Sequence, residues 1–241
     1  MRLILSLLAV NLLIIQVTNP LSDSRQLIVV TTNNWEAVDG ALQRYERAAA
    51  DQPWRPVGER IPIVVGRNGM AWWRGLHGAA IGDGPVKKEG DGKSPAGVFS
   101  LSSAFGYSSK EQAGKVKLPY VQATATLECV DDSLSVHYNQ VLDRKSVTSP
   151  DWKSSEQMRR QDELYRWGVV VDHNVEREAG CGSCIFLHIW SGPGKGTAGC
   201  TAMDVSKMVE VLSWLDPEKK PVLAQLPVNE FSRLRQSWGL P

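Results

Sequence analysis

The sequence predicts a mainly β protein, with α+β character only at its margins. The chain has 241 residues, 42% of them hydrophobic and 22% charged, which is enough to bury one sizeable core. Short segments rich in valine, isoleucine and threonine recur along it, separated by turn residues. No internal repeat and no Ser/Gly/Pro-rich linker divides the chain. We therefore expect a single domain.

Strand patterns and turn residues together place the β elements. An Asn68-Gly69 turn predicts a hairpin between two of the strands. A loop over 81–97, dense in glycine, lysine and aspartate, precedes another strand. The predicted strands are 61–65, 70–74, 98–101, 121–130, 167–171, 184–190 and 220–226.

Helical spacing of apolar residues and the presence of N-cap residues predict helices at the margins. Asn34 precedes the first of them, and Asp204 precedes the third. In the third helix Met208, Val211 and Leu212 share the face that we expect to point inward. The predicted helices are 35–50, 154–166, 205–214 and 228–238.

The first 24 residues have the pattern of a secretory signal peptide. Met1-Arg2 give a positive start, and residues 3–17 are apolar apart from three polar positions. As a helix this stretch spans about 22 Å, against the ~30 Å of a membrane's hydrocarbon core. No small-x-small cleavage site stands out, so an uncleaved anchor and a buried helix stay open. The sequence predicts export to the periplasm or cell envelope, with residues 25–241 as the domain.

The charge balance disfavours several classes of partner. Lys plus Arg number 27 and Asp plus Glu 26, giving a formal net charge of +1 without a basic stripe. Nucleic-acid binding is therefore disfavoured. The chain has no nucleotide-binding loop and no EF-hand, so we expect no cofactor and no metal. We expect a monomer that contacts a membrane only if the N-terminal segment stays uncleaved.

The stretch from His188 to Cys200 carries the most specific chemistry. His188 ends an apolar strand, a Gly-rich loop follows, and a Gly199-Cys200 turn closes it. An imidazole beside a thiol lowers the thiol's pKa and produces the nucleophilic thiolate. A tight turn at Gly199 would aim the amides around Cys200, that of Thr201 included, at a developing oxyanion. A buried structural cysteine beside a hydrogen-bonded histidine is the alternative.

These residues resemble the signature of the L,D-transpeptidase catalytic domain family, the YkuD-like fold. The family pattern has a histidine after an apolar strand and then a Ser/Thr-x-Gly-Cys turn, here Thr197-Ala198-Gly199-Cys200. Residues 90–99 are similar to the family's segment of Gly, Lys, Thr/Ser-Pro and Gly before a strand. The two blocks stand in the expected order, and the resemblance covers residues 60–215.

The resemblance implies a β-sandwich catalytic domain with flanking helices that acts on peptidoglycan stem peptides. Cys200 would attack the bond between the L-centre of a diamino acid and a terminal D-residue, and His188 would act as general base and then acid. Backbone amides at Gly199 and Cys200 would hold the oxyanion. An amine acceptor gives a cross-link, whereas water gives L,D-carboxypeptidase activity. A non-catalytic module that binds cell-wall peptide is a further alternative.

Two departures from the family pattern mark a divergent member. Ala202 stands where the motif usually continues with arginine, so substrate handling should differ from the family's. Ile189 and Trp190 follow the histidine, where the family often has glycine. We interpret Trp190, Thr197 and His173 as candidate walls of the substrate cleft. A hydrogen-bonded structural role is the other interpretation of His173.

Export would place the four cysteines in an oxidising compartment, as two disulfides or as one disulfide beside special thiols. Cys129 is expected to bond Cys181 or Cys184, which leaves Cys200 reduced. We favour Cys129–Cys184 because both flank predicted strands, and a Cys181–Cys184 staple stays open. The same CxxC suits a thiol oxidoreductase, although a strand rather than a helix is predicted after it. A Cys₃His zinc site is the remaining alternative.

Overall fold

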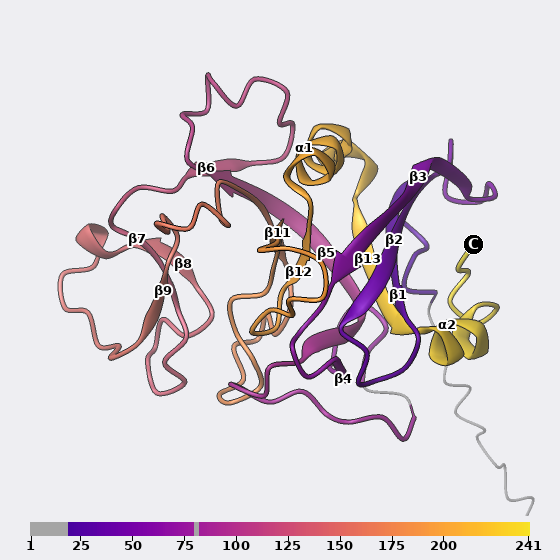
Figure 1. Cartoon of the computed structure of the whole chain (residues 1–241), viewed down its shortest axis with the longest axis horizontal. Coiled ribbons are helices and arrows are strands. Elements are labelled where there is room, and N and C mark those ends of the chain that lie inside the picture. The colour runs from indigo at the N-terminus through magenta and orange to yellow at the C-terminus, as the bar shows by residue number, and fades with distance from the viewer. Residues whose placement is uncertain (1–18, 80–81) are drawn as a thin grey trace, which may run out of the picture.

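The main body of the molecule is one ten-stranded sheet. It is seen in a computed structural model that describes residues 19–79 and 82–241, in which 35% of the chain is strand and 10% is helix (Figure 1). The mainly β prediction is therefore confirmed. The strands of this sheet are β1 (Gln26–Thr32), β2 (Asp39–Glu46), β3 (Arg55–Val64), β4 (Met70–Trp72), β5 (Ser94–Gly106), β6 (Tyr120–Gln122), β10 (Trp167–Val171), β11 (Phe186–Ile189), β12 (Thr201–Met203) and β13 (Val222–Pro227).

β5 closes this sheet on itself because it pairs with different neighbours along its length. Its residues 97–100 lie antiparallel to β13, and its later residues lie antiparallel to β10. The strand order β10-β11-β12-β3-β2-β1-β13-β5 therefore returns to β10. β4 and β6 add in parallel at the two ends of β5. Closure pairs the strands that would otherwise form exposed edges.

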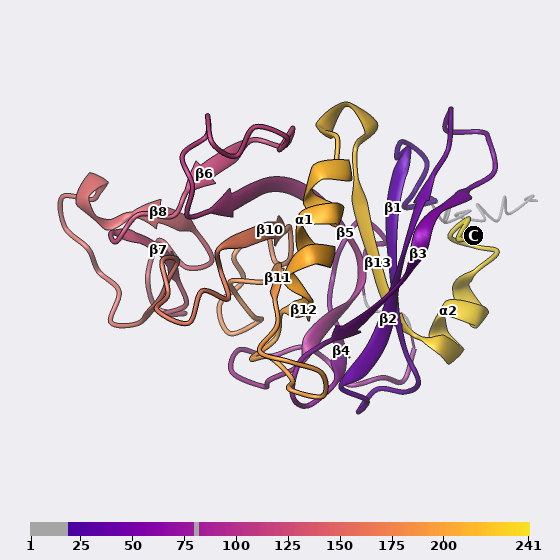
Figure 2. The same cartoon turned by 45° about the horizontal axis from the view of Figure 1, so that its top comes forward.

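A second, three-stranded sheet lies at one end of the molecule. It consists of β8 (Val141–Asp143), β7 (Leu127–Val130) and β9 (Ser155–Gln157), in that order and antiparallel. Figures 1 and 2 both show β11 and β12 between this small sheet and β1 to β3.

Two α-helices flank the main sheet. α1 (Val205–Trp214) packs against β10, β11 and β12, and α2 (Val228–Leu234) packs against β1 and β13. Asp204 caps α1 by accepting the Ser206 N–H at 2.8 Å, as predicted. The predicted inward face of α1 is also confirmed, since it buries Met208, Val211 and Leu212.

The first predicted helix, over 35–50, is wrong. Asn34 does make the capping contacts, because its Oδ1 accepts the N–H groups of Glu36 (3.1 Å) and Ala37 (2.8 Å). The chain then extends as β2 instead of coiling, since β1 and β3 supply backbone partners on both sides. Tertiary pairing therefore overrides a local helix signal here.

The predicted helix over 154–166 and the predicted hairpin at Asn68-Gly69 are also wrong. Residues 155–157 form β9, and Glu163 lies in the left-handed region with φ of 58°, which a continuing helix does not allow. β4 pairs with β5 in parallel, and only an isolated bridge joins Gly66 to Gly69. The last predicted helix is shorter than expected, because α2 ends at Leu234.

The folded part of the chain begins before the predicted boundary at residue 25. Leu21 is fully buried in the core, and its N–H donates to Asn19 Oδ1 at 2.9 Å. Arg47 Nε holds the Ser24 carbonyl at 2.7 Å. Residues 1–18 of the predicted signal segment lie outside the described residues. Within the two described ranges no helix has the length and apolar character to cross a membrane.

Acid is expected to destabilise this fold through buried histidines. Burial lowers the pKa of His77 to about 4 and that of His173 to about 3, from an ordinary value of 6.5. The unfolded chain therefore binds more protons below pH 6.5, and stability is lost as the pH falls from there toward 4. At pH 5 the lowered pKa of His77 alone should reduce the free energy of unfolding by about 2 kcal/mol.

Urea unfolding at pH 7.5 and at pH 5.0 measures this loss directly. His77→Gln is expected to narrow the difference between the two pH values, because glutamine can accept the Val98 N–H that His77 Nδ1 accepts at 3.1 Å without titrating. A stability that is equal at both pH values would contradict the prediction.

Candidate active site

A Gly-rich loop brings His188 and Cys200 to neighbouring strands. β11 and β12 lie side by side in parallel, with His188 opposite Ala202, and the loop over 190–200 joins them. The loop passes close to another segment at Gly196, where a Cβ atom would lie only 2.5 Å from the Arg67 Cα. The Arg67 N–H donates to the Thr197 carbonyl at 2.8 Å and fixes the loop there.

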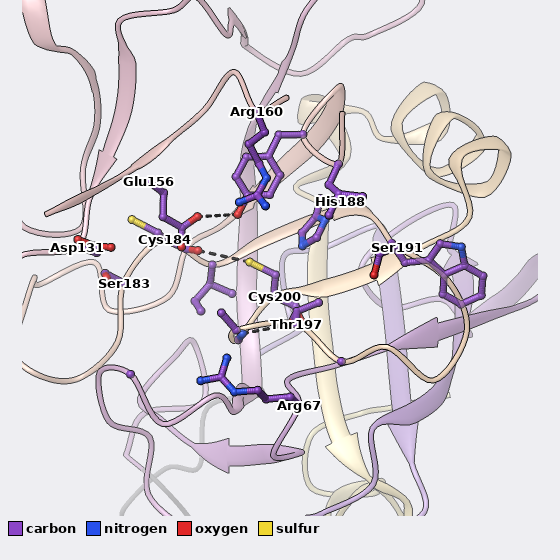
Figure 3. A pocket seen from close by; sticks show the side chains of 18 of the residues that line it. Arg67, Asp131, Glu156, Arg160, Ser183, Cys184, His188, Ser191, Thr197 and Cys200 are labelled. Carbon is purple, nitrogen blue, oxygen red and sulfur yellow. Dashed lines mark hydrogen bonds between the residues drawn. The ribbon is translucent and has the colours of Figure 1, made fainter. Parts of the chain in front are cut away.

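The His188 imidazole is held in one tautomer. Its Nδ1 lies 2.8 Å from the Ile189 carbonyl oxygen, which can only accept, so Nδ1 carries the proton. The lone pair is then on Nε2, and Figure 3 shows the ring extending toward Cys200. Burial, aided by the charge of Arg160, lowers the pKa of His188 to about 4. His188 is therefore neutral at physiological pH and able to accept a proton.

Cys200 is buried, with only 5% of its surface exposed, and its sulfur has two backbone partners. The Phe186 N–H donates to Sγ at 3.3 Å, and the thiol donates to the Cys184 carbonyl at 3.5 Å. Burial, with the charge of Glu156 adding to it, raises the pKa of Cys200 to about 12. The expected thiolate beside His188 is thus not the resting state, in which the thiol and the imidazole are both neutral.

The turn before Cys200 differs from the tight glycine turn that we expected. Gly199 is not among the glycines with left-handed backbone, and its role is close approach. A Cβ atom there would lie 3.2 Å from the Lys93 carbonyl oxygen and 3.3 Å from Ile185 Cδ1. The Gly199 N–H is already donated to Thr197 Oγ1 at 3.1 Å, whereas the Cys200 N–H has no acceptor among the described residues. Of these two amides, that of Cys200 is available for an oxyanion.

A cavity of about 340 Å³ opens beside Cys200 and His188. Trp190 and Thr197, two of the predicted cleft residues, line it, and Gly199 lines it as well. Thr201 does not, because its side chain is buried and its Oγ1 donates to Gln225 Oε1 at 2.5 Å. The predicted pair, Cys200 and His188, therefore lines the same cavity as Trp190 and Thr197, two of the three predicted cleft residues.

His173 lies outside this cavity. It is buried, and its Nε2 lies 3.0 Å from the Cys181 carbonyl oxygen. Its ring contacts those of Trp73 and Phe99. His173 therefore has the hydrogen-bonded structural role that was its alternative interpretation. It is not part of the cleft wall, where we had also predicted it.

Most of the charged side chains around the cavity are not marked by any sequence pattern. Apart from Lys195, which lies in the Gly-rich loop itself, they come from other loops and from β9, far from the His188–Cys200 block in sequence, and no motif marks them. Tyr165 lies in the segment 154–166, which was wrongly predicted to be a helix. These lining residues are Arg67, Lys87, Glu89, Asp131, Glu156, Arg160, Tyr165 and Lys195.

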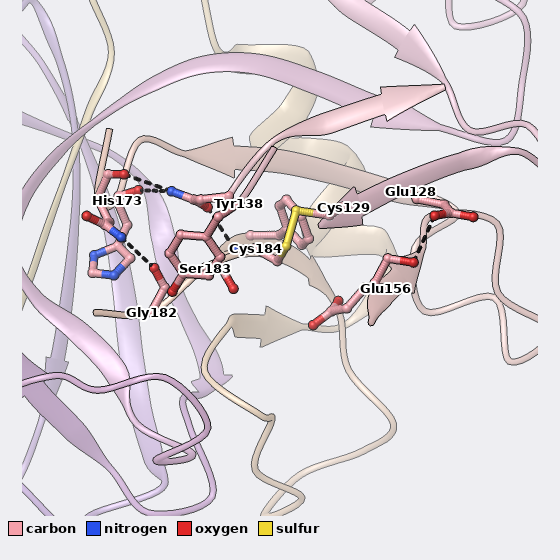
Figure 4. The surroundings of a disulfide bond; sticks show 12 residues. Glu128, Cys129, Tyr138, Glu156, His173, Gly182, Ser183 and Cys184 are labelled. Atoms are coloured by element: carbon pink, nitrogen blue, oxygen red, sulfur yellow. Dashed lines mark hydrogen bonds between the residues drawn. A yellow bond between two sulfur atoms is a disulfide. The ribbon is translucent and has the colours of Figure 1, made fainter. Parts of the chain in front are cut away.

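The favoured disulfide, Cys129–Cys184, is confirmed (Figure 4). It joins β7 of the small sheet to the segment just before β11, so it ties the small sheet to the site. Cys181 is free and partly exposed, and Cys200 is free and buried. Because Cys184 is bonded to Cys129, the Cys181–Cys184 staple is wrong, and Cys184 cannot supply a zinc thiolate in this state.

Ala202, which stands in place of the family's arginine, is fully buried on β12. A guanidinium would not fit there without displacing the core. Arg67 lines the cavity from another segment, and among the described residues it has no ion-pair partner. Comparison of the chain with protein-family models, curated protein sequences and solved structures gave no match.

Proposed function

We propose that the protein is an exported, monomeric cysteine acyl transferase of the L,D-transpeptidase type, acting on peptidoglycan stem peptides, and that its closed sheet is a divergent form of that family's fold. The supporting observation is the pair formed by Cys200 and a neutral His188 at one cavity. The Cys129–Cys184 disulfide supports a place in the periplasm or cell envelope, since such bonds persist in oxidising compartments.

The chemistry follows from the neutral resting pair. As Cys200 Sγ attacks the scissile carbonyl carbon, its proton passes to His188 Nε2. The carbonyl oxygen becomes an oxyanion that the Cys200 N–H can stabilise. When the intermediate collapses, the C–N bond breaks and the leaving amine takes the proton from Nε2. The acyl group stays on sulfur as a thioester until an acceptor attacks it, again with His188 taking a proton.

The acceptor decides between two activities of the same site. An amine acceptor gives transpeptidation, whereas water gives an L,D-carboxypeptidase. One observation favours a second candidate, a module that binds cell-wall peptide without turning it over. Its support is the thiol itself, which is buried, protonated at rest and hydrogen-bonded to the Cys184 carbonyl.

A mass-spectrometric assay with purified tetrapeptide muropeptides tests the proposal. The protein is incubated with them, with and without an added D-amino acid. Loss of the terminal D-residue, its exchange for the added one, or a cross-linked dimer would each support the enzyme and would name the acceptor. Binding of the muropeptide without any of these products would favour the binding module instead.

The pH dependence of turnover is expected to be flat from about pH 6 to 9. His188 must be unprotonated to act as base, and its pKa of about 4 keeps it so throughout this range. Activity should fall as the pH drops toward 4, because protonation of Nε2 removes the base. The ratio kcat/KM measured across this range checks it. A bell-shaped profile centred near pH 7 would instead indicate a resting thiolate–imidazolium pair.

A further inference from the structure

Arg67 is a charged side chain of the cavity that the chemistry described so far does not use. It is exposed, and it lines the same cavity as Cys200 and His188. Among the described residues its guanidinium has no ion-pair or hydrogen-bond partner. The N–H donors of Arg67 are therefore available to a ligand in the cavity.

The segment that carries Arg67 is clamped to the Gly-rich loop. The Thr197 N–H donates to the Val65 carbonyl at 3.0 Å, and the Arg67 N–H donates to the Thr197 carbonyl at 2.8 Å. Thr197 Oγ1 in turn donates to the Cys200 carbonyl at 2.6 Å. Two successive hydrogen bonds thus connect the backbone of Arg67 with that of Cys200 and fix the position of one relative to the other.

The stem of the Arg67 side chain packs against the backbone at Gly92. A Cβ atom at Gly92 would lie only 3.2 Å from Cγ and 3.1 Å from Nε of Arg67, so the glycine makes room for this side chain. A stem that is already held in place loses less conformational freedom when a ligand binds its guanidinium.

The other cations at the cavity are less suited to bind a ligand carboxylate. Lys87 is 3% exposed and is ion-paired with Asp91 at 2.6 Å. Arg160 is already bound to an aspartate by two hydrogen bonds, at 2.9 and 2.5 Å. Lys195 has no ion-pair partner among the described residues, but a lysine ammonium lacks the planar fork that binds both oxygens of a carboxylate. Arg67 combines that fork with the absence of a partner.

Acidic side chains line a different part of the cavity. Figure 3 shows Asp131 and Glu156 on a different side of Cys200 from Arg67. Asp131 directly follows β7 and Glu156 lies on β9, so both belong to the end of the molecule that holds the small sheet. Asp131 Oδ1 is buried, and no donor among the described residues reaches it. Acceptors are already in excess there, so the favourable place for a ligand carboxylate is at Arg67.

We propose that Arg67 binds the free carboxylate of the substrate's terminal residue and so makes the site specific for the end of a peptide chain. The guanidinium donates two parallel hydrogen bonds to that carboxylate. The scissile carbonyl is the next one along the peptide, and the clamp between Arg67 and the loop places it at Cys200 Sγ. A peptide bond that no free carboxylate follows is then a poor substrate. The inference rests on the proposed function, from which it takes the peptide substrate.

Two synthetic stem tetrapeptides that differ only in the terminal group, a carboxylate or a carboxamide, test this. The ratio kcat/KM is measured for both peptides with the parent and with Arg67→Met. We expect the parent to prefer the carboxylate about ten- to hundredfold, which is what hydrogen bonds to a charged group contribute. Arg67→Met should turn over the carboxylate peptide as slowly as the carboxamide and leave the carboxamide rate unchanged. A merely structural role would slow both peptides equally.

Arg67→Lys is the second variant, and it should keep part of the preference because it keeps the charge without the fork. Arg60→Met is the matched control. Arg60 is also exposed and without an ion-pair partner among the described residues, but it lies on β3 and does not line the cavity. Its preference should equal that of the parent.

Three outcomes overturn the inference. They are a parent without a preference, a full preference in Arg67→Met, and a loss of the preference in Lys195→Met but not in Arg67→Met. If Arg67→Met does not fold, an undiminished preference in Arg67→Lys overturns it instead.

Calorimetric binding separates this inference from the proposed function. If the parent turns over neither peptide, the affinities of the same two peptides for the parent and for Arg67→Met are measured. A preference for the carboxylate that Arg67→Met removes would keep the inference and overturn the proposed function. Turnover with a preference that Arg67→Met leaves intact would do the reverse. A parent that neither binds nor turns over either peptide would overturn both.

Discussion

Replacing Cys200 with alanine is expected to reduce muropeptide turnover to background. No other free thiol lines the cavity among the described residues, and without Sγ the thioester cannot form. The loss should exceed that of His188→Ala, which is expected to cost about 10²- to 10⁴-fold, as for a general base. Product formation by mass spectrometry measures both variants, and the parent should also show the acyl mass on the peptide that contains Cys200.

The alanine variant needs a folding control, because it leaves the Phe186 N–H without the sulfur that it bonds at 3.3 Å. An unpaired buried donor costs about 1–3 kcal/mol. Cys200→Ser restores an acceptor at that place while supplying a much weaker nucleophile, and it should be equally inactive with more of the parent's stability. Turnover above 1% of the parent in a folded Cys200→Ala variant would contradict a cysteine mechanism.

Removing the disulfide with Cys129→Ala and Cys184→Ala is expected to lower the free energy of unfolding by about 4 kcal/mol. The bond closes a loop between residues 55 apart in sequence, and cross-linking a loop of that length restricts the unfolded chain to about this extent. The measurement is urea unfolding of the oxidised parent and of the double variant. Equal stability within 1 kcal/mol would contradict the prediction.

The same double variant should also lose turnover while it is still folded. The Cys184 carbonyl accepts a hydrogen bond from the Cys200 thiol. The disulfide also holds the small sheet, whose strand β9 carries the cavity residue Glu156. Cys181→Ala is the matched control. Cys181 is partly exposed, and its sulfur donates to the Ala179 carbonyl at 3.6 Å, within its own loop, so this variant should change neither property.

Local sequence patterns predicted the structure correctly in short segments whose conformation depends mainly on neighbouring residues. Asp204 and the spacing of Met208, Val211 and Leu212 predicted α1 and its buried face correctly. The β-branched run over 167–171 predicted β10 with its observed bounds. The Gly-rich loop between two apolar segments also brought His188 and Cys200 to one cavity, because the chain between them is short.

Where long-range pairing competes with local preference, the same patterns failed. Asn34 makes its capping bonds, yet β2 follows because β1 and β3 offer hydrogen-bond partners that a helix would leave unpaired. The closure of the sheet through β5 and β10 has no sequence signal at all, since it depends on strands 60 or more residues apart.

The sequence alone determined the fold class, the Cys-His pair and the favoured disulfide of this protein. Only the tertiary structure decided the protonation of that pair and which side chains surround it. A thiol pKa of about 12 and an imidazole pKa of about 4 result from burial, which depends on everything packed around the two side chains. Glu156 and Tyr165 line the same cavity as Cys200 because of tertiary packing, and proximity of that kind carries no local sequence pattern.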